Sequence, residues 1–516
     1  MMFYTGGISF NFARNLFFRR YSTKLANSNL AGYTPPTYNR LRTLLQPIKD
    51  TWKKKGASIC SDRCSDSQRS LINIMVASAA GPMFLKAIDA SHITKDVEYI
   101  AKVFTEVVEE IGPANIFQIV TDNGSNFKAA GALIETKYPR IFWTPCVVHC
   151  LNLAIKSICD PNEKSRDYAQ CEWIKELVTQ DHDISYFILN HSLPRTIFSR
   201  YSDVKLLKVA ETRFASNIIM LTRIRRVREA LEKTVMDPDW KKTRGSLGNA
   251  IELKSREIKD TLVSDTWWDK IDYFLRFTEP ILRFLKVADS DSCVLHLVYD
   301  MWDAMIEEIK SCIFYQENED LLTGYQLDFF DVVQKIIEDR WNRSNTPLHC
   351  LAHSLVPKYY SQQWLQRSAH GVRRGAFASD LDYFGQPHLM ASRDDEDPLS
   401  WWANYGSFRP LLQGLAFRLL SQPATSSCCE RNWSTYGSIR NVKRNRLTTQ
   451  RTEDLVNVHN NVRIVSRKQP EYTSDPCKFW DIGGDTADGD SILEIADLSL
   501  NDPEIEAVTF DVDNKS

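Results

Sequence analysis

Residues 119–126 read IVTDNGSN, the clearest passage in the chain from a buried strand to a helix. The apolar run ends at Asp122, and small polar residues follow before a segment with a helical pattern begins. An aspartate just past a buried strand can form a turn, cap the next helix or bind a metal ion. The surrounding sequence has to distinguish these three roles.

The segments before this stretch predict a sheet with a helical crossover. Three closely spaced apolar segments are typical of an antiparallel meander, at residues 56–62, 69–78 and 81–90. An amphipathic helix follows at 94–111, with Thr94 as the predicted N-cap and Gly112 as the stop. Residues 115–122 then form a short buried strand, which returns parallel to the first after the helix.

The order of these elements predicts the position of two acidic residues. A helix at 125–138, a strand at 140–146 and a helix at 147–159 complete the pattern. Strand, strand, strand, helix, strand, helix, strand, helix is the order of an RNase H-like α/β core, in which the first strand is central and the fourth lies beside it. Asp62 and Asp122 would then lie close together. The alternative is that Asp122 forms an Asx turn and Asp62 caps a loop.

Composition indicates a globular protein that stays inside the cell. The chain has 516 residues, of which 43% are hydrophobic and 25% charged. Its net charge is -2, and an acidic stretch lies at residues 481–513. The rest of the chain is net basic. Twelve cysteines and no secretory signal predict reduced thiols. No segment reaches the ~20 apolar residues of a membrane helix, so we expect no membrane partner.

The remaining chain is mostly helical. Its acid-free beginning, taken alone, would pass for a mitochondrial transit peptide. Residues 161–400 contain few convincing strands, and the acidic end of the chain is expected to be disordered. We predict five regions: a partly ordered N-terminal segment at 1–52, the first part of the core at 53–160, a helical insertion at 161–400, a final helical region at 401–468, and a disordered tail at 469–516.

Three blocks of sequence resemble the plant hAT-superfamily transposases. Residues 71–91 and 107–158, which include TDNGSN, are similar to a domain of unknown function found in those proteins. Residues 415–464, which include SSCCERNWS, are similar to their C-terminal dimerisation domain. The resemblance extends from about Phe3 to Arg467 and includes the start of the chain, which favours it over a transit peptide.

The resemblance implies a nuclear transposase that acts on DNA as a homodimer or higher oligomer. It implies an RNase H-like core interrupted by the helical insertion, a dimerisation region at 401–468, and three catalytic acids: Asp62, Asp122 and Glu430. Phosphodiester cleavage and strand transfer use two divalent ions about 4 Å apart. Hard Mg²⁺ binds carboxylate oxygens. We therefore expect the three acids to bind Mg²⁺ or Mn²⁺, about 4–8 Å from one another, without a small-molecule cofactor.

Three departures from the family pattern favour an alternative function. The family usually has Trp two residues after the first acid, whereas this chain has Cys64. The segment at 41–56 is shorter than in relatives, and no Cys/Cys/His/His set of a BED-type zinc finger precedes Asp62. The alternative is a domesticated, non-catalytic nuclear protein that dimerises and binds DNA or chromatin partners.

Other residues near these acids suggest supporting roles. Cys146 and His149 form a C-x-x-H motif where the family has one, and Cys350 and His353 form a second. Zinc would need four such ligands in one place, and we expect Mg²⁺ or Mn²⁺ instead of zinc. A structural or DNA-contacting role is expected for Cys146, His149, Arg431 and Trp433.

Basic, aromatic and apolar residues are further candidates for DNA contacts or for a dimer surface. We expect phosphate contacts, with a solvated helix face as the alternative, from Arg440, Lys443, Arg444 and Arg446. A second basic group has less support, at Arg223, Arg225, Arg226 and Arg228. Trp401 and Trp402 can stack on a flipped base, although we favour buried packing. An apolar stripe fits either a dimer surface or the core, at Leu415, Leu419, Leu420, Leu455, Val456, Val458 and Val462.

Overall fold

The computed structural model describes residues 45–65, 70–92, 96–164, 168–207, 215–244, 249–317, 328–360 and 386–439, together with 453, 455–457 and 460–461. One mixed sheet has the strand order β3-β2-β1-β4-β5, with β1 at Ala57–Ser65, β2 at Ser70–Ala77, β3 at Met83–Asp89, β4 at Ile116–Thr121 and β5 at Phe142–Pro145. The first three strands are antiparallel, whereas β4 is parallel to β1 and β5 to β4. The predicted central first strand beside the fourth is confirmed.

Three helices cover one face of the sheet: α4 (Gln46–Lys55), α5 (Val97–Ile111) and α6 (Ser125–Lys137). Strand residues such as Ile59 and Ile72 pack against them, because alternate side chains of a strand point to the same face. Helix α5 begins two residues later than predicted, since Asp96 is the N-cap and its carboxylate accepts from the Tyr99 amide at 2.8 Å. It ends at Gly112 as predicted, where φ is 95°.

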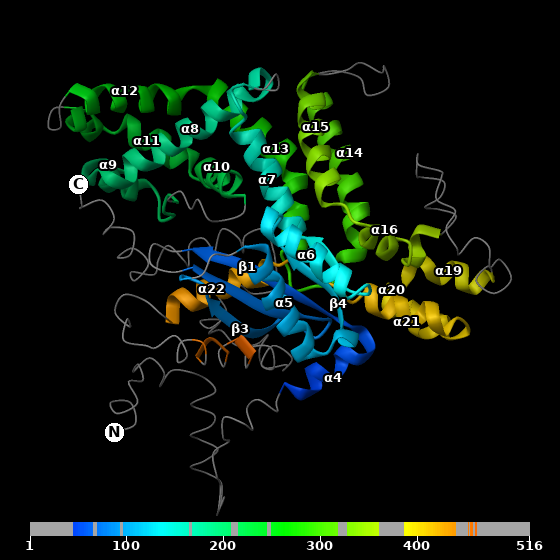
Figure 1. Ribbon diagram of the computed structural model, residues 1–516. Coiled ribbons are helices and arrows are strands. Elements are labelled where there is room, and N and C mark those ends of the chain that lie inside the picture. Colours follow the sequence, from blue (N-terminus) through cyan, green and yellow to red (C-terminus); the bar gives the residue numbers. More distant parts are fainter. Residues whose placement is uncertain are drawn as a thin grey trace, which may run out of the picture.

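The opposite face is covered by α7 (Val147–Cys159) and by the C-terminal helix α22 (Ser427–Ile439). Helix α21 (Pro410–Leu419) packs against α4. Figure 1 shows α5 and α22 on opposite faces of the sheet. The edge strand β3 is also covered, because Asn461 accepts from the Phe84 amide and donates to the Phe84 carbonyl, both at 3.0 Å. This side chain satisfies backbone groups that an edge strand would otherwise expose.

The described residues between 161 and 400 contain no strand, and we call them the helical region. Its helices are α8 (Tyr168–Asn190), α9 (Ser192–Tyr201), α10 (Ser216–Arg226), α11 (Arg228–Met236), α12 (Asn249–Val263), α13 (Asp265–Ala288), α14 (Val298–Gln316), α15 (Asp328–Ser344), α16 (Pro347–His353), α19 (Pro387–Asp395) and α20 (Pro398–Tyr405). Short 3-10 helices are η2 (Pro113–Asn115), η3 (Pro238–Arg244), η4 (Leu295–Leu297), η5 (Pro357–Tyr360) and η7 (Gly406–Phe408). None of the described helices has the length and apolar character needed to cross a bilayer.

One apolar core continues from the sheet into the helical region. It includes Val120 of β4, Leu151 of α7 and Phe274 of α13. In Figure 1 helices α8 to α15 lie beyond one side of the sheet, and α7 extends from the sheet toward them. The predicted domain boundaries remain predictions, but the described parts of these regions pack around a shared core.

Burial decides between several alternatives that the sequence left open. Trp401 and Trp402 are fully buried, and the Trp402 indole donates to the Leu355 carbonyl at 2.7 Å, which confirms packing over base stacking. Leu419, Leu420 and Val456 are buried in the same core, and Leu415 packs against it. Leu455 is exposed. Val458 and Val462 lie outside the described residues.

Of the second predicted basic group, Arg223, Arg225 and Arg228 are engaged within the fold, whereas Arg226 is exposed. Arg223 is buried and donates to the Lys205 carbonyl at 2.6 Å. Arg225 pairs with Asp272, and Arg228 pairs with acidic neighbours on its own helix and on α13. The predicted phosphate contacts Arg440, Lys443, Arg444 and Arg446 lie outside the described residues, as do residues 1–44 and the acidic tail.

Candidate active site

Residues 421–429 bring the C-terminal region back to the sheet through buried polar contacts. The Gln422 carboxamide accepts from the Ser58 hydroxyl at 2.7 Å. The Gln118 amide group donates to Ser58 at 3.0 Å and to the Pro423 carbonyl at 2.7 Å. A buried polar group left without a partner costs about 1–3 kcal/mol. These contacts therefore fix the register of the returning segment against β1 and β4.

The next residues of this segment extend the network toward α22. The Cys60 thiol donates to the Thr425 carbonyl at 3.6 Å, and the Thr425 hydroxyl lies 3.2 Å from Cys146 Sγ. Further along, the Asn73 side chain donates to the Cys429 carbonyl at 3.0 Å. Strands β1 and β2 and the start of α7 thus hold the chain immediately before Glu430.

Four consecutive side chains at the start of α22 contact four different elements. Glu430 contacts His149 of α7, Arg431 contacts the loop after α13, Asn432 contacts Asn73 of β2, and Trp433 contacts Asp62 of β1. The Trp433 indole donates to Asp62 Oδ2 at 3.1 Å across a separation of 371 residues. Successive side chains are about 100° apart around a helix, so these contacts fix the helix rotation.

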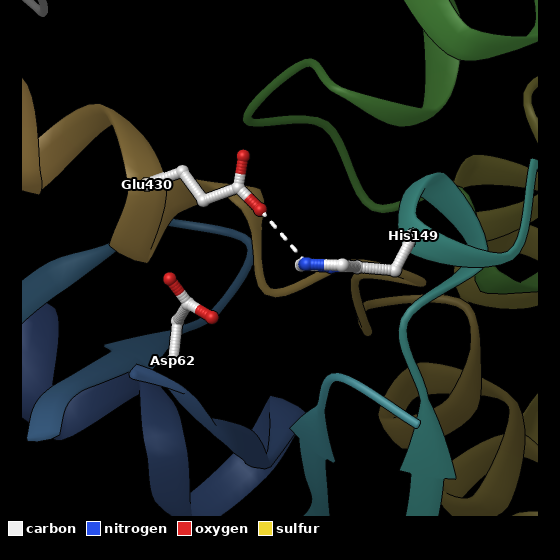
Figure 2. A group of neighbouring side chains, drawn as sticks. All are labelled: Asp62, His149 and Glu430. Atoms are coloured by element: carbon white, nitrogen blue, oxygen red, sulfur yellow. Dashed lines mark ion pairs between the residues drawn. The ribbon is translucent and has the colours of Figure 1, made fainter. Parts of the chain in front are cut away.

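Asp62, His149 and Glu430 form a compact group of potential metal ligands. One ligand atom from each lies within 4.8 Å of the others, and Figure 2 shows their polar groups pointing into one space. His149 Nε2 lies 3.2 Å from Glu430 Oε1. Asp62 is 6% exposed. The fold therefore brings together two of the three predicted acids, which lie in distant parts of the sequence.

Asp122 lies outside this group of three. It follows the C-terminal end of β4, next to β1, and its Oδ1 accepts from the Gly124 amide at 3.0 Å. This contact is the Asx turn that the sequence offered as the alternative role. Burial is the largest cause of the raised pKa of Asp62, and the charge of Asp122 adds to it. The turn uses only Oδ1 of Asp122. Its other carboxylate oxygen, Oδ2, takes no part in the turn, so Asp122 can form the turn and still be a metal ligand.

The pKa values of all three side chains in this group are raised. Burial raises the pKa of Asp62, and it raises the pKa of Glu430 to about 9 against the opposing effect of His149. Burial by itself lowers the pKa of His149, but its contact with Cys146 and the charges of Glu430 and Asp62 outweigh this and raise the pKa to about 10. Two negative carboxylates are unfavourable when they are buried close together. A proton or a cation bound between Asp62 and Glu430 is therefore favoured.

The donor atoms fit a divalent cation of the harder type. Two carboxylates suit Mg²⁺ or Mn²⁺, and the imidazole suits Mn²⁺ better than Mg²⁺. The two C-x-x-H motifs do not join into one group of ligands among the described residues. Cys146 contacts Thr425, whereas the His353 ring stacks on Tyr359 with centroids 4.0 Å apart.

Sequence reasoning placed His149 in a supporting role and did not pair it with Glu430. The available signal was its position in the first turn of the helix that follows β5, at the same edge of the sheet as Asp122. The partners of Arg431, which are Asp289 and Asp291, were missed altogether. They lie in a loop of the helical region without a recognisable motif.

Two known families match the chain. Residues 36–184 match the domain of unknown function DUF659, and residues 381–462 match the hAT family C-terminal dimerisation region. Together, the two matches support an hAT-superfamily transposase. A search of the curated proteins found no match.

The hAT assignment accounts for where the site residues come from. The first matched region contains Asp62, Asp122 and His149, and the second contains Glu430 and Trp433. The fold joins these two regions at the group of potential ligands. The dimerisation region supports homo-oligomerisation of this hAT protein.

Proposed function

We propose that this hAT protein is a nuclear transposase that cleaves and joins DNA strands through an RNase H-like core. Asp62, Asp122 and Glu430 would hold Mg²⁺ or Mn²⁺. The observation that carries the proposal is the convergence of Asp62 and Glu430, with carboxylate oxygens within 4.8 Å of each other. The strand order β3-β2-β1-β4-β5, with β1 beside β4, supports the same core.

The residues of the proposed site have different roles. Divalent ions bound there would activate the attacking oxygen and stabilise the leaving oxygen. Trp433 donates to Asp62 Oδ2 and so orients this carboxylate. Gly124 orients Asp122 through Oδ1. His149 holds a proton beside Glu430 Oε1, at a position where positive charge is favoured.

Calorimetric titration with Mn²⁺ tests the proposal. We expect the wild type to bind Mn²⁺ and the variants Asp62→Asn, Asp122→Asn and Glu430→Gln to bind at least about tenfold more weakly, because each loses a charged ligand. The matched control is Glu110→Gln, which removes an exposed carboxylate that pairs with Lys86 on the surface. A Glu430→Gln variant that binds Mn²⁺ as well as the wild type would remove Glu430 from the site.

The alternative is a domesticated, non-catalytic nuclear protein that dimerises and binds DNA or chromatin partners. Cys64 in place of the family's usual Trp favours it, and so does the His149–Glu430 contact, which satisfies the glutamate within the protein. It predicts negligible Mn²⁺ heats for the wild type and all variants. Retention of DNA by the same preparations in a filter-binding assay would then support this alternative.

A further inference from the structure

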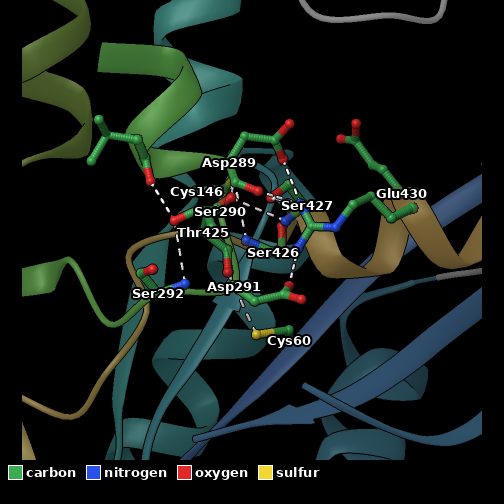
Figure 3. Close-up of polar contacts among 12 residues, drawn as sticks. Cys60, Cys146, Asp289, Ser290, Asp291, Ser292, Thr425, Ser426, Ser427 and Glu430 are labelled. Carbon is green, nitrogen blue, oxygen red and sulfur yellow. Dashed lines mark hydrogen bonds and ion pairs between the residues drawn. The ribbon is translucent and has the colours of Figure 1, made fainter. Parts of the chain in front are cut away.

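The loop between α13 and η4 reaches from the helical region to the start of α22. The Arg431 guanidinium donates to Asp289 Oδ1 at 2.7 Å, and its second terminal nitrogen pairs with Asp291 Oδ1. Arg431 also donates to the Asp289 carbonyl and to the Ser427 hydroxyl. Figure 3 shows Asp289 and Asp291 on this loop, on the side where Ser427 and Glu430 lie.

The same loop holds the segment that leads into α22. The Cys293 thiol donates to the Ser421 carbonyl at 3.0 Å. The Leu295 amide donates to the Gln422 carbonyl at 3.2 Å. The loop therefore contacts the returning chain both before Thr425 and after it.

These contacts bear on the Glu430 carboxylate through helix geometry. Neighbouring residues differ by about 100° around a helix axis, so a fixed Arg431 side chain restricts the rotation of α22 and the direction of Glu430. Charge-assisted hydrogen bonds are stronger than neutral ones, and an arginine with several partners has a defined orientation. Asp291 is 15% exposed, and this partial burial limits competition from water.

We propose that Asp289 and Asp291 are positioning residues, which hold Arg431 and thereby set the place of the Glu430 carboxylate relative to Asp62. The helical region would then contribute directly to the geometry of the metal site. Both aspartates lie outside the two regions that match known families. This inference rests on the proposed function, because it concerns the same metal site.

The test compares the double variant Asp289→Asn/Asp291→Asn with the wild type. Its matched control is Glu279→Gln/Glu308→Gln, because the exposed Arg283 of α13 also pairs with two carboxylates, that of Glu279 at 2.6 Å and that of Glu308 on α14 at 2.5 Å. We expect the Mn²⁺ Kd to rise about 10- to 100-fold in the double variant, as when an outer partner of a metal ligand is lost. Amide hydrogen exchange in α22 should become faster. The control should change neither quantity.

A conservative variant separates positioning from general stabilisation. Asp289→Asn/Asp291→Glu restores one carboxylate for Arg431 and should recover most of the Mn²⁺ affinity at an unchanged melting temperature. If the double variant does not fold, Asp291→Asn alone replaces it, and we expect a smaller rise in the Mn²⁺ Kd because Arg431 then loses one of its two carboxylate partners. Wild-type Mn²⁺ affinity in folded protein without these carboxylates overturns the proposal.

If the proposed function is wrong, the Mn²⁺ and hydrogen-exchange results differ from those expected if only the positioning role is wrong. If the wild type binds no Mn²⁺, the metal site is wrong, and hydrogen exchange decides the positioning role by itself. Faster exchange of α22 in the double variant, with an unchanged control, then still supports the contact of Asp289 and Asp291 with Arg431 as the element that orders α22. Unchanged exchange overturns it.

Discussion

Asp181 shows at the scale of a single residue how burial alone sets a charge state. It lies on α8 and is 1% exposed, and neither of its carboxylate oxygens has a hydrogen-bond partner in the described structure. Burial raises its pKa from 3.8 to about 8, so the group is protonated at neutral pH. The fold tolerates a buried acid by keeping it uncharged.

The pH dependence of stability follows from this shift. Because the folded-state pKa is above the ordinary value, the contribution of protonated Asp181 is fully present below about pH 4 and is lost as pH rises through about 8. We expect Asp181→Asn, which cannot ionise, to gain stability over the wild type by up to about 1.4 kcal/mol per pH unit within this window. Urea unfolding at several pH values measures the difference.

The control for this prediction is on the same helix. Glu176 is exposed, so Glu176→Gln should leave the pH profile of stability close to that of the wild type. A constant difference between wild type and Asp181→Asn from pH 4 to pH 8 would show that Asp181 keeps its ordinary ionisation.

At the scale of elements, the packing of α6 against β5 depends on a glycine. A Cβ built at Gly131 would lie 2.3 Å from Cγ of Trp143, so only glycine allows this approach. The Trp143 indole donates to the Thr121 hydroxyl at 3.0 Å, and Thr121 directly precedes Asp122. The contact between α6 and β5 therefore helps to place the end of β4.

We expect Gly131→Ala to lower the free energy of unfolding by about 1–3 kcal/mol, because the added methyl group forces the Trp143 side chain or the helix to move. Thermal unfolding followed by circular dichroism measures the change. The matched control is Gly414→Ala in α21, where a Cβ would meet no atom within 4 Å. There alanine should stabilise by about 0.5–1 kcal/mol. Equal effects of the two substitutions would contradict the packing argument.

At the scale of the whole molecule, the sheet and the C-terminal region share one core. Strand residues Cys60, Met75 and Phe84 pack in the same cluster as Ala424 and Cys428. Removing the C-terminal region would expose this face of the sheet to water and break the hydrogen bonds of residues 421–429. Burial of apolar surface is the main favourable term in folding.

We therefore expect a chain that ends at residue 400 not to fold, although it contains the whole sheet. Circular dichroism and resistance to proteolysis, compared with a chain that ends at residue 468, measure this. The longer chain keeps the region that the second family match covers, and it should unfold cooperatively. A soluble, protease-resistant product ending at residue 400 would show that the sheet is independent of the C-terminal region.

The sequence by itself determined the order of the local elements and their boundaries to within a few residues. The first strand, the helix that stops at Gly112 and the short strand before Asp122 follow from apolar periodicity and from turn residues, which depend on near neighbours. The resemblance to hAT transposases selected Glu430 as the third acid. The helical character of residues 161–400 was also readable from periodicity.

Only the tertiary structure decided which distant side chains meet. The pairing of Glu430 with His149, and of Arg431 with Asp289 and Asp291, depends on the register of the chain at residues 421–429 against the sheet. That register is set by buried hydrogen bonds between residues hundreds of positions apart, such as Ser58 with Gln422. Such long-range contacts leave no periodic pattern and no local bias in composition in the sequence. They form only when the segments pack together in the folded core.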